Sequence, residues 1–191
     1  AKITASSISN IRVTDRAIEE TILLEFLIQD AGIDELRFQL PASMADARIS
    51  AGLMRQLVME PVDAAQPEGL QQVTLSLQDE VIGQFKVLIE HDKVLDDSKL
   101  QSAPIPLIQT GQTSVRYVTV DSTGDEVKID SHAGLEEMAP QSTAYQSLVN
   151  RIGGAIGKAY STTGQAARLE YQITQRAVRE VISARISLSN I

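Results

Sequence analysis

The chain has 191 residues, of which 43% are hydrophobic and 22% charged, values of an ordinary globular protein rather than a disordered one. Its formal net charge is -8, with 25 acidic and 17 basic residues and no run of Lys or Arg. Nucleic-acid binding depends on neutralising phosphates, so this balance argues against a nucleic-acid partner.

Two residue types are scarce or missing. There is no cysteine, which excludes disulfides, thiolate metal sites and a Cys nucleophile. The aromatic residues are three Phe and four Tyr, with no Trp, although carbohydrate and single-stranded nucleic-acid platforms need exposed aromatic faces. No run of 18 or more apolar residues exists, so we expect no direct membrane insertion within this chain.

Three segments in the first half alternate apolar and polar residues, the pattern of half-buried strands. They are 36–40, which Pro41 ends, then 73–77 and 85–89. The last two are separated by a polar stretch at 78–80 and by Gly83. We therefore predict that 73–77 and 85–89 form an antiparallel hairpin.

The alternation returns in the second half. A polar, glycine-containing turn at 121–125 separates two alternating segments, which predicts an antiparallel hairpin between 115–120 and 127–130. Further strands are predicted at 169–173 and 184–188. Clean alternation is typical of antiparallel sheets with one buried face, so the predicted fold is mainly β, an antiparallel β-sandwich with one or two short helices.

Two apolar stripes have helical spacing instead. The first covers 45–58 but includes Gly52 and a strand-like run at 57–59, so helix and strand both remain open there. The second runs from Leu148 to Tyr160 and includes three glycines, each of which costs a helix interior about 1 kcal/mol relative to Ala. We predict a short helix within 134–151 and leave helix and strand open over 145–160.

The predicted organisation is a single β-rich domain, 1–191, belonging to a larger protein. The chain begins at Ala1 and ends directly after a strand-like run, so we expect any signal or anchor to lie outside it. The best linker candidate is 96–106, with Pro104 and Pro106, and the alternative is a division there into two β subdomains. One domain is favoured because halves of about 90 residues would have thin cores.

Several segments resemble catalytic or ligand-binding motifs only in part. The run Gly153-Gly154-Ala155-Ile156-Gly157-Lys158 lacks the first Gly and the final Ser or Thr of a phosphate-binding loop, so close backbone packing or a loop is the better interpretation. The run Asp121-Ser122-Thr123-Gly124 lacks the second carboxylate motif of an aspartic protease and fits a hairpin turn. Neither motif predicts a cofactor.

The two histidines are 41 residues apart and have no partner at metal-ligand spacing. We interpret both His91 and His132 as exposed loop residues. If the protein were an enzyme, the best acid–base candidates would be Glu136 and Glu137 beside His132. Because no activated nucleophile, metal site or preorganised anion site is recognisable, we predict no catalytic, cofactor-binding or metal-binding residue.

The order of several short segments resembles a known architecture. These segments are Leu36–Pro41, Val115-Arg116-Tyr117-Val118-Thr119-Val120, Val127–Asp130, Ala133-Gly134-Leu135-Glu136-Glu137-Met138 and Leu169-Glu170-Tyr171-Gln172-Ile173-Thr174. Over about two thirds of the chain they resemble the β-rich ectodomains of large membrane-anchored bacterial envelope proteins. The resemblance implies a periplasmic or cell-surface location, an anchor outside this chain, and a structural or adhesive role.

The favoured function is therefore a non-catalytic structural or protein-interaction module of an extracytoplasmic bacterial envelope protein. Its expected partners are other domains of the same larger protein and possible separate protein partners. The alternative is a ligand-binding β-sandwich for peptide or glycan, in which an edge strand could accept a peptide by β-augmentation. An enzyme with an unrecognised pair of acids is the third hypothesis.

Overall fold

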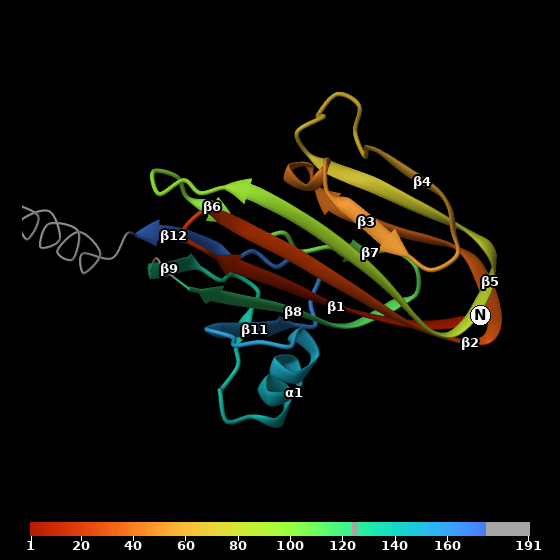
Figure 1. Ribbon diagram of the computed structural model, residues 1–191. Helices are drawn as coiled ribbons and strands as arrows, with labels where there is room; N and C mark the ends of the chain where they lie inside the picture. The colour runs from red at the N-terminus through yellow and green to blue at the C-terminus, as the bar shows by residue number, and fades with distance from the viewer. Residues whose placement is uncertain (124–125, 175–191) are drawn as a thin grey trace, which may run out of the picture.

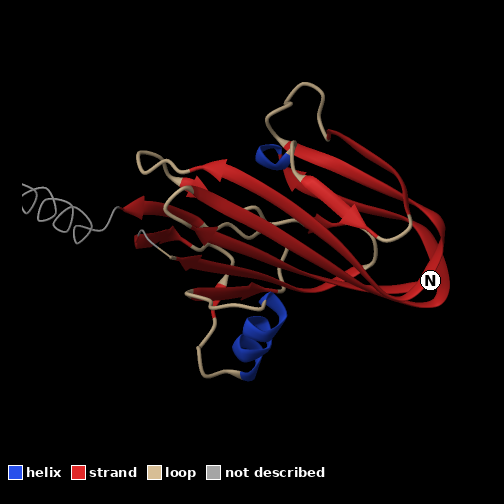
Figure 2. Ribbon diagram, in the orientation of Figure 1, coloured by secondary structure: helices blue, strands red, loops and turns tan. Residues whose placement is uncertain are grey.

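The computed structural model describes residues 1–123 and 126–174, and the fold of this part is mainly β, as the alternation predicts (Figures 1 and 2). Two sheets and one α-helix account for its regular structure. The elements are β1 (Lys2–Val13), β2 (Ala17–Pro41), the 3-10 turn η1 (Ala42–Met44), β3 (Arg48–Ala51), β4 (Met54–Pro61), β5 (Leu70–Val94), β6 (Gln101–Ser102), β7 (Leu107–Ile108), β8 (Gln112–Ser122), β9 (Glu126–Ser131), β10 (Glu136–Glu137), α1 (Thr143–Ile152), β11 (Lys158–Thr162) and β12 (Glu170–Thr174).

The centre of the fold is an antiparallel ribbon of the two longest strands, β2 and β5, each of 25 residues. Residues 17–28 of β2 pair with 83–94 of β5, and 33–41 pair with residues between 70 and 81. Between these halves the register shifts, and the left-handed residues Asp30 (φ 73°) and Gly83 (φ 88°) occupy the bend. In Figure 1 the ribbon turns at the end of the molecule where the N-terminus lies and runs back over itself.

The bend brings the two halves of the ribbon face to face around a first apolar core. Ile22 and Leu24 from the first half of β2 pack with Phe38 and Leu40 from its second half, and all four are fully buried. Because inward side chains alternate along each strand, one long strand contributes to both layers of the core. The folded ribbon therefore acts as a sandwich made from a continuous sheet.

The other strands extend this sheet to nine. Its path runs β10-β11-β8-β1-β2-β5-β3, with β4 also beside β5 and β7 beside β2. Strand β1 pairs antiparallel with β2 along its whole length and parallel with β8. The β1–β8 pair is the parallel exception in an otherwise antiparallel sheet.

A smaller sheet, in the order β6-β12-β9, covers another part of the nine-stranded sheet and encloses a second core. Ile11 and Ile18 of the large sheet pack there with Tyr171 and Ile173 of β12. Ala103, in the proline-rich segment 96–106, is buried in the same core.

Helix α1 packs on the side of the large sheet opposite these cores. The Ser142 side chain accepts a hydrogen bond from Tyr145 N at the N-terminus, and Gly153 (φ 75°) ends the helix in the left-handed conformation. Tyr145 and Leu148 pack against Ile8 of β1 and form a third apolar cluster. None of the described helices is long and apolar enough to cross a membrane.

The structure corrects both predicted hairpins. Segments 73–77 and 85–89 belong to the single strand β5, and each pairs with β2 instead of with the other. Segment 115–120 lies in β8, which pairs with β1 and β11, whereas 127–130 lies in β9, which pairs with β12 in the smaller sheet. The first segment is continuous through Gly83 in one bent strand, and the second contributes strands to two different sheets.

The helix predictions are resolved in opposite ways. Segment 45–58 contains no α-helix and forms β3 and the start of β4, joined at Gly52 and Leu53 (φ 57°). The helix predicted within 134–151 exists as α1 but is shorter at its start, and the chain returns to a strand at β11 after the glycines. The strand prediction at 36–40 is confirmed within β2, that at 169–173 is confirmed nearly in full as β12, and that at 184–188 lies outside the described residues.

Candidate functional site

A buried group of ionisable side chains lies where the large sheet meets the smaller one. Glu20 of β2 and His91 of β5 are directly opposite in the antiparallel register, so their side chains share the core-facing side. Glu20 Oε1 lies 2.8 Å from His91 Nδ1, and Lys93 Nζ lies 3.2 Å from Glu20 Oε2 in an ion pair without hydrogen-bond alignment. The Glu20 side chain is completely buried.

Two further residues complete this group. His91 Nε2 lies 2.8 Å from Oδ1 of Asp46, an exposed residue between η1 and β3. Carboxylates accept hydrogen bonds and do not donate them, so only the imidazolium form of His91 can donate to both Glu20 and Asp46. On the other side is Tyr171 of β12, whose buried hydroxyl has no hydrogen-bond partner in the described part of the chain. Burial, and secondarily the charge of Glu20, raise the pKa of Tyr171 far above its usual range.

We define the buried network as Glu20, His91, Lys93 and Tyr171, with the exposed Asp46 at its margin. Two cations balance two carboxylates when His91 is protonated, and the groups come from both sheets and the β3 connection. Five clefts on the described surface are lined by residues outside this network. The network is therefore arranged to join elements rather than to present a base or an acid to a ligand in one of these clefts.

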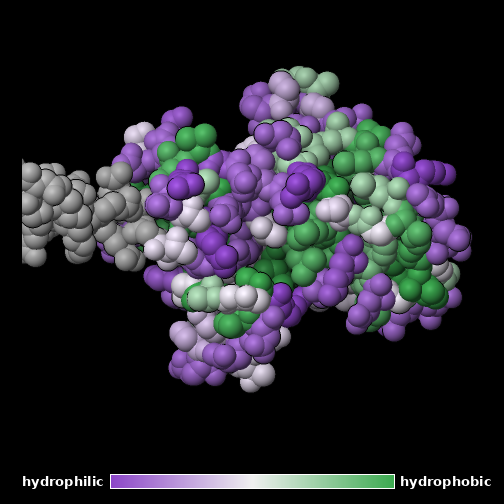
Figure 3. Space-filling model, in the orientation of Figure 1, coloured by the Kyte–Doolittle hydropathy of each residue, from purple (hydrophilic) through white to green (hydrophobic). Residues whose placement is uncertain are grey.

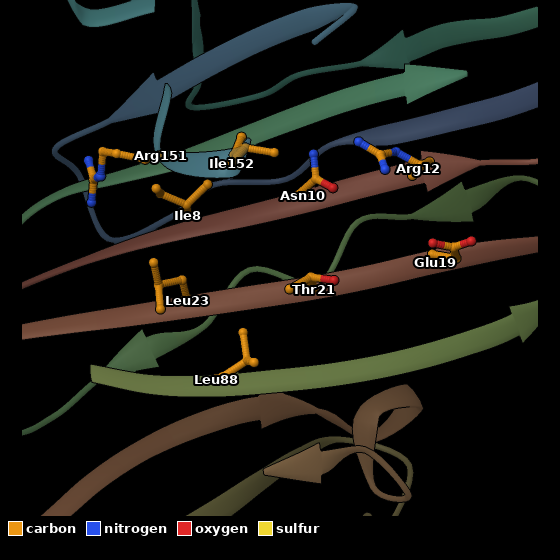
Figure 4. Close-up of a pocket in the computed structure, with 9 residues that line it drawn as sticks. All are labelled: Ile8, Asn10, Arg12, Glu19, Thr21, Leu23, Leu88, Arg151 and Ile152. Carbon is orange, nitrogen blue, oxygen red and sulfur yellow. The ribbon is translucent and has the colours of Figure 1, made fainter. Parts of the chain in front are cut away.

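A second candidate is the groove below α1 on the outer face of the large sheet (Figure 4). It has a volume of about 270 Å³, and Figure 4 shows Asn10 and Arg12 along β1, with Thr21 on the neighbouring strand. Two polar side chains of β1 in this groove already have partners, because Arg12 pairs with Asp121 at 2.9 Å and Asn10 donates to Thr119 Oγ1 at 2.8 Å. Arg151 at the other end pairs with Glu25 at 2.7 Å and holds α1 to the sheet.

The third candidate is an unpaired strand edge, the β4 edge, which we define as residues 53–62. Strand β4 pairs with β5 on one side and has no partner strand on the other among the described residues. Leu53, Leu57, Val58 and Val62 are between 37% and 50% exposed. Figure 3 shows apolar residues gathered over the half of the molecule that carries β3, β4 and the bend of the β2–β5 ribbon.

The register indicates which backbone groups of the β4 edge are free. Val62 N donates to Leu70 O at 2.9 Å, so this pair is hydrogen-bonded to β5. Bonded and non-bonded pairs alternate in an antiparallel ladder, which directs the N–H and C=O groups of Leu57 and Met59 away from β5. Pro61 lies at a position of the same parity, where an edge strand tolerates a residue without an N–H.

The residues singled out as acid–base candidates do not come together as a catalytic group. Glu136 and Glu137 are exposed on the short strand β10. His132 is exposed, as predicted, but its Nδ1 lies 3.1 Å from Leu135 O and its ring centroid 5.2 Å from that of Tyr160. Burial, with a smaller contribution from Glu137, raises the pKa of Tyr160.

The interpretation of His91 as an exposed loop residue is wrong. It lies within β5, and its side chain is only 8% exposed. The sequence contains a signal that would have located its partner: Glu20 occupies the apolar phase of the alternating run Ile18, Glu20, Ile22, Leu24. A charged residue at a core-facing position predicts a buried partner of opposite charge.

The incomplete motifs have structural roles. Gly153 ends α1, and a Cβ on Gly157 would lie 2.6 Å from Val120 O, so this glycine allows close backbone approach. Asp121 is buried and pairs with Arg12. Within residues 1–123 and 126–174, no group of three or more His, Cys, Asp or Glu side chains is placed to hold a metal ion.

The comparisons with known proteins identify no family. Neither a protein-family model nor the sequence of a curated protein matches this chain. Among solved structures, native leukotriene A4 hydrolase from Saccharomyces cerevisiae aligns with a TM-score of 0.41 and 10% identity, covering 90% of this chain and 29% of that chain. The same yeast hydrolase in complex with bestatin gives 0.41 and 10%, covering 91% and 29%. At this level, the likeness carries no functional inference.

Proposed function

We propose that this chain is a non-catalytic protein-interaction module of an extracytoplasmic bacterial envelope protein, and that it binds an extended segment of another domain or protein along the β4 edge. The observation that supports this proposal most directly is the unpaired, apolar edge of β4. Exposed edges of this kind accept an added strand, with main-chain hydrogen bonds supplying affinity and side-chain contacts supplying specificity.

The side chains of the β4 edge suit this kind of partner. Leu57 and Met59 stand opposite the buried residues Leu75 and Val73, so they point to the core side at the open margin of the first core. A strand added beside them would extend this layer and cover apolar surface that β4 alone leaves exposed. This supports an extended peptide with apolar residues at alternate positions.

Glycan recognition has less support than peptide recognition. All three Phe and all four Tyr lie within the described residues, and each is buried or half-buried. A flat aromatic face of the kind that stacks on sugars is therefore missing from the described surface. The location outside the cytoplasm rests on the resemblance of short segments of this chain to envelope ectodomains. Protease accessibility of the full-length protein in intact cells would test it.

A displayed library of eight-residue peptides, selected for binding to the purified chain, tests the β4 edge. The informative variant is Met59→Pro, which removes an N–H that points to the incoming strand and none that bonds to β5. Met59→Ala is the matched control, because it shortens the same side chain and retains the N–H. We expect selected peptides to bind the parent chain and Met59→Ala similarly, and Met59→Pro at least about tenfold more weakly.

Circular dichroism and thermal melts must first show that Met59→Pro retains the fold. Peptides that bind the folded Met59→Pro variant as well as they bind Met59→Ala would show that the edge is not the binding surface. That result would contradict the proposal.

A further inference from the structure

The strongest unassigned feature outside the buried network and the β4 edge is a buried cation. Arg116 of β8 is 3% exposed, yet no carboxylate pairs with it within the described part of the chain. Its Nη1 donates to Pro106 O at 3.1 Å, and its Nη2 donates to Gly164 O at 2.6 Å and Gln165 O at 2.7 Å. Burial lowers the pKa of Arg116, which reflects the cost of desolvating the guanidinium.

The three hydrogen bonds of Arg116 neither neutralise its positive charge nor use all of its N–H donors. Carbonyl oxygens solvate the guanidinium but do not neutralise it. Of its five N–H donors, three are used in these contacts, and the Nε–H and one Nη1–H have no acceptor among the described residues. A buried charge is normally paired, so Arg116 retains the capacity to bind an anion.

Arg116 lies in the wall of a cleft of about 540 Å³, a size suited to a small ligand. The cleft opens beside the loop before β8 and the loop that follows β11. None of its ten lining residues is acidic, although the whole chain carries 25 acidic residues. Arg116 is the only charged residue among those ten.

The rest of the cleft lining supplies neutral hydrogen-bonding groups. The side chains of Gln112, Thr113 and Gln165 have no hydrogen-bond partner within the described residues. Gln109 accepts from Gln72, which leaves its own amide N–H₂ free to donate. One buried cation surrounded by neutral donors matches the charge of a monoanion better than that of a phosphate dianion.

We propose that this cleft binds a small polar carboxylate, with Arg116 as the charge partner and the surrounding amides and hydroxyls as neutral donors. The carboxylate oxygen accepts from the guanidinium, and no covalent step is involved. This ligand site is separate from the β4 edge, so either proposal can fail without the other.

Nitrogen-15 NMR titration of the intact chain tests the site. The probes are N-acetylglycine, its uncharged amide and inorganic phosphate, each at an ionic strength held constant with sodium chloride, because salt screens charge interactions. We expect N-acetylglycine to shift the Arg116 Nε–H signal and the amides of Gly111 and Gly164 saturably. The amide probe should leave these signals in place, and phosphate should bind more weakly.

Gln112→Glu is the decisive variant, because it places a tethered carboxylate in the cleft without removing the hydrogen bonds of Arg116 to the three carbonyls. We expect it to weaken N-acetylglycine binding at least about tenfold through the high local concentration of the tethered group. Gln172→Glu, at an exposed position of β12 outside this cleft, is the isosteric control and should bind like the parent.

Three results would overturn the proposal. They are no saturable shift in the parent chain, equal binding by phosphate, and a Gln112→Glu variant that binds as tightly as Gln172→Glu. Arg116 would then serve only to hold the 163–165 loop against Pro106.

Discussion

At the scale of single residues, the main feature is a carboxylate at a position built for an apolar side chain. Glu20 faces the core between Ile18 and Ile22, and within the described part of the chain its contacts with His91 and Lys93 compensate for its burial. Removing one member of a buried ion pair leaves the remaining buried charge poorly compensated, which costs far more than losing a surface pair.

We predict that Glu20→Gln lowers the free energy of unfolding by about 3–5 kcal/mol, since His91 and Lys93 then lose their buried counter-charge. The control is Glu35→Gln on the same strand, whose carboxylate is 46% exposed and pairs with Arg37 at 2.6 Å. That change should cost at most about 1 kcal/mol. Urea denaturation of both variants measures the difference, and equal losses would contradict the role assigned to the network.

The hydroxyl of Tyr171 leads to a prediction about pH. Its pKa is raised in the folded state by burial and by Glu20, so the folded chain holds this proton more tightly than the unfolded chain does. The contribution to stability is fully present below the ordinary tyrosine pKa of about 10 and decreases as pH rises above it. Tyr171→Phe should remove this part of the alkaline loss.

Chemical denaturation of the parent and Tyr171→Phe at pH 8 and pH 11 measures the effect. At pH 8 we expect the variant to be as stable as the parent or more stable, because it removes a buried hydroxyl without a partner. At pH 11 its advantage should increase. Tyr160, whose pKa is also raised, is present in both chains and cancels from the comparison. An advantage that does not change with pH would show that Tyr171 titrates normally.

At the scale of elements, the bend in the β2–β5 ribbon distinguishes this fold from a set of simple hairpins. Gly83 adopts φ 88° at the bend and pairs with Ile28, directly before the stretch of β2 that contains Asp30 and does not pair with β5. Side chains with a Cβ disfavour this backbone region, whereas glycine adopts it readily.

We predict that Gly83→Ala lowers the unfolding free energy by about 1–2 kcal/mol through backbone strain alone. A Cβ at Gly83 would meet no atom within 4 Å, so crowding does not contribute. Gly52→Ala is the matched control, because its Cβ would also meet nothing within 4 Å and its φ is not positive. Thermal melts should show no loss for Gly52→Ala, and equal losses would exclude a special role of the bend.

At the scale of the whole molecule, the two larger apolar cores share one sheet. The first lies inside the folded ribbon, the second lies below the smaller sheet, and β1 and β2 contribute to both. The segment 96–106 adds Ala103 to the second core. Because the same strands contribute to both cores, we expect the two cores to unfold together in one cooperative transition.

We therefore predict one unfolding transition, lowered by a cavity in either core. Phe38→Ala in the first core should cost about 3–5 kcal/mol, and Ile173→Ala in the second about 2–5 kcal/mol, as expected for large-to-small changes at buried sites. Calorimetry and far-ultraviolet circular dichroism should report coincident transitions for both variants. Two separate transitions, each sensitive to one substitution, would instead favour a division of the chain near 96–106.

The local sequence identified several of the strands, because a period of two in apolar residues follows directly from the alternation of side chains on a pleated strand. The segments 36–40 and 169–173 and the mainly β composition of the fold were predictable on this basis. The pattern also contained the position of Glu20 as an exception to the apolar phase.

Strand partners were decided only by the tertiary structure. Alternation states which face of a strand is buried but not which strand lies beside it, so 73–77 and 85–89 fit a hairpin as well as they fit one bent strand. The buried network also depends on the tertiary structure, since residues 20 and 91 meet through the β2–β5 register and Tyr171 approaches from the other sheet. Contacts between residues so distant in sequence depend on how the whole chain packs around its apolar cores. A local sequence pattern contains no information about that packing.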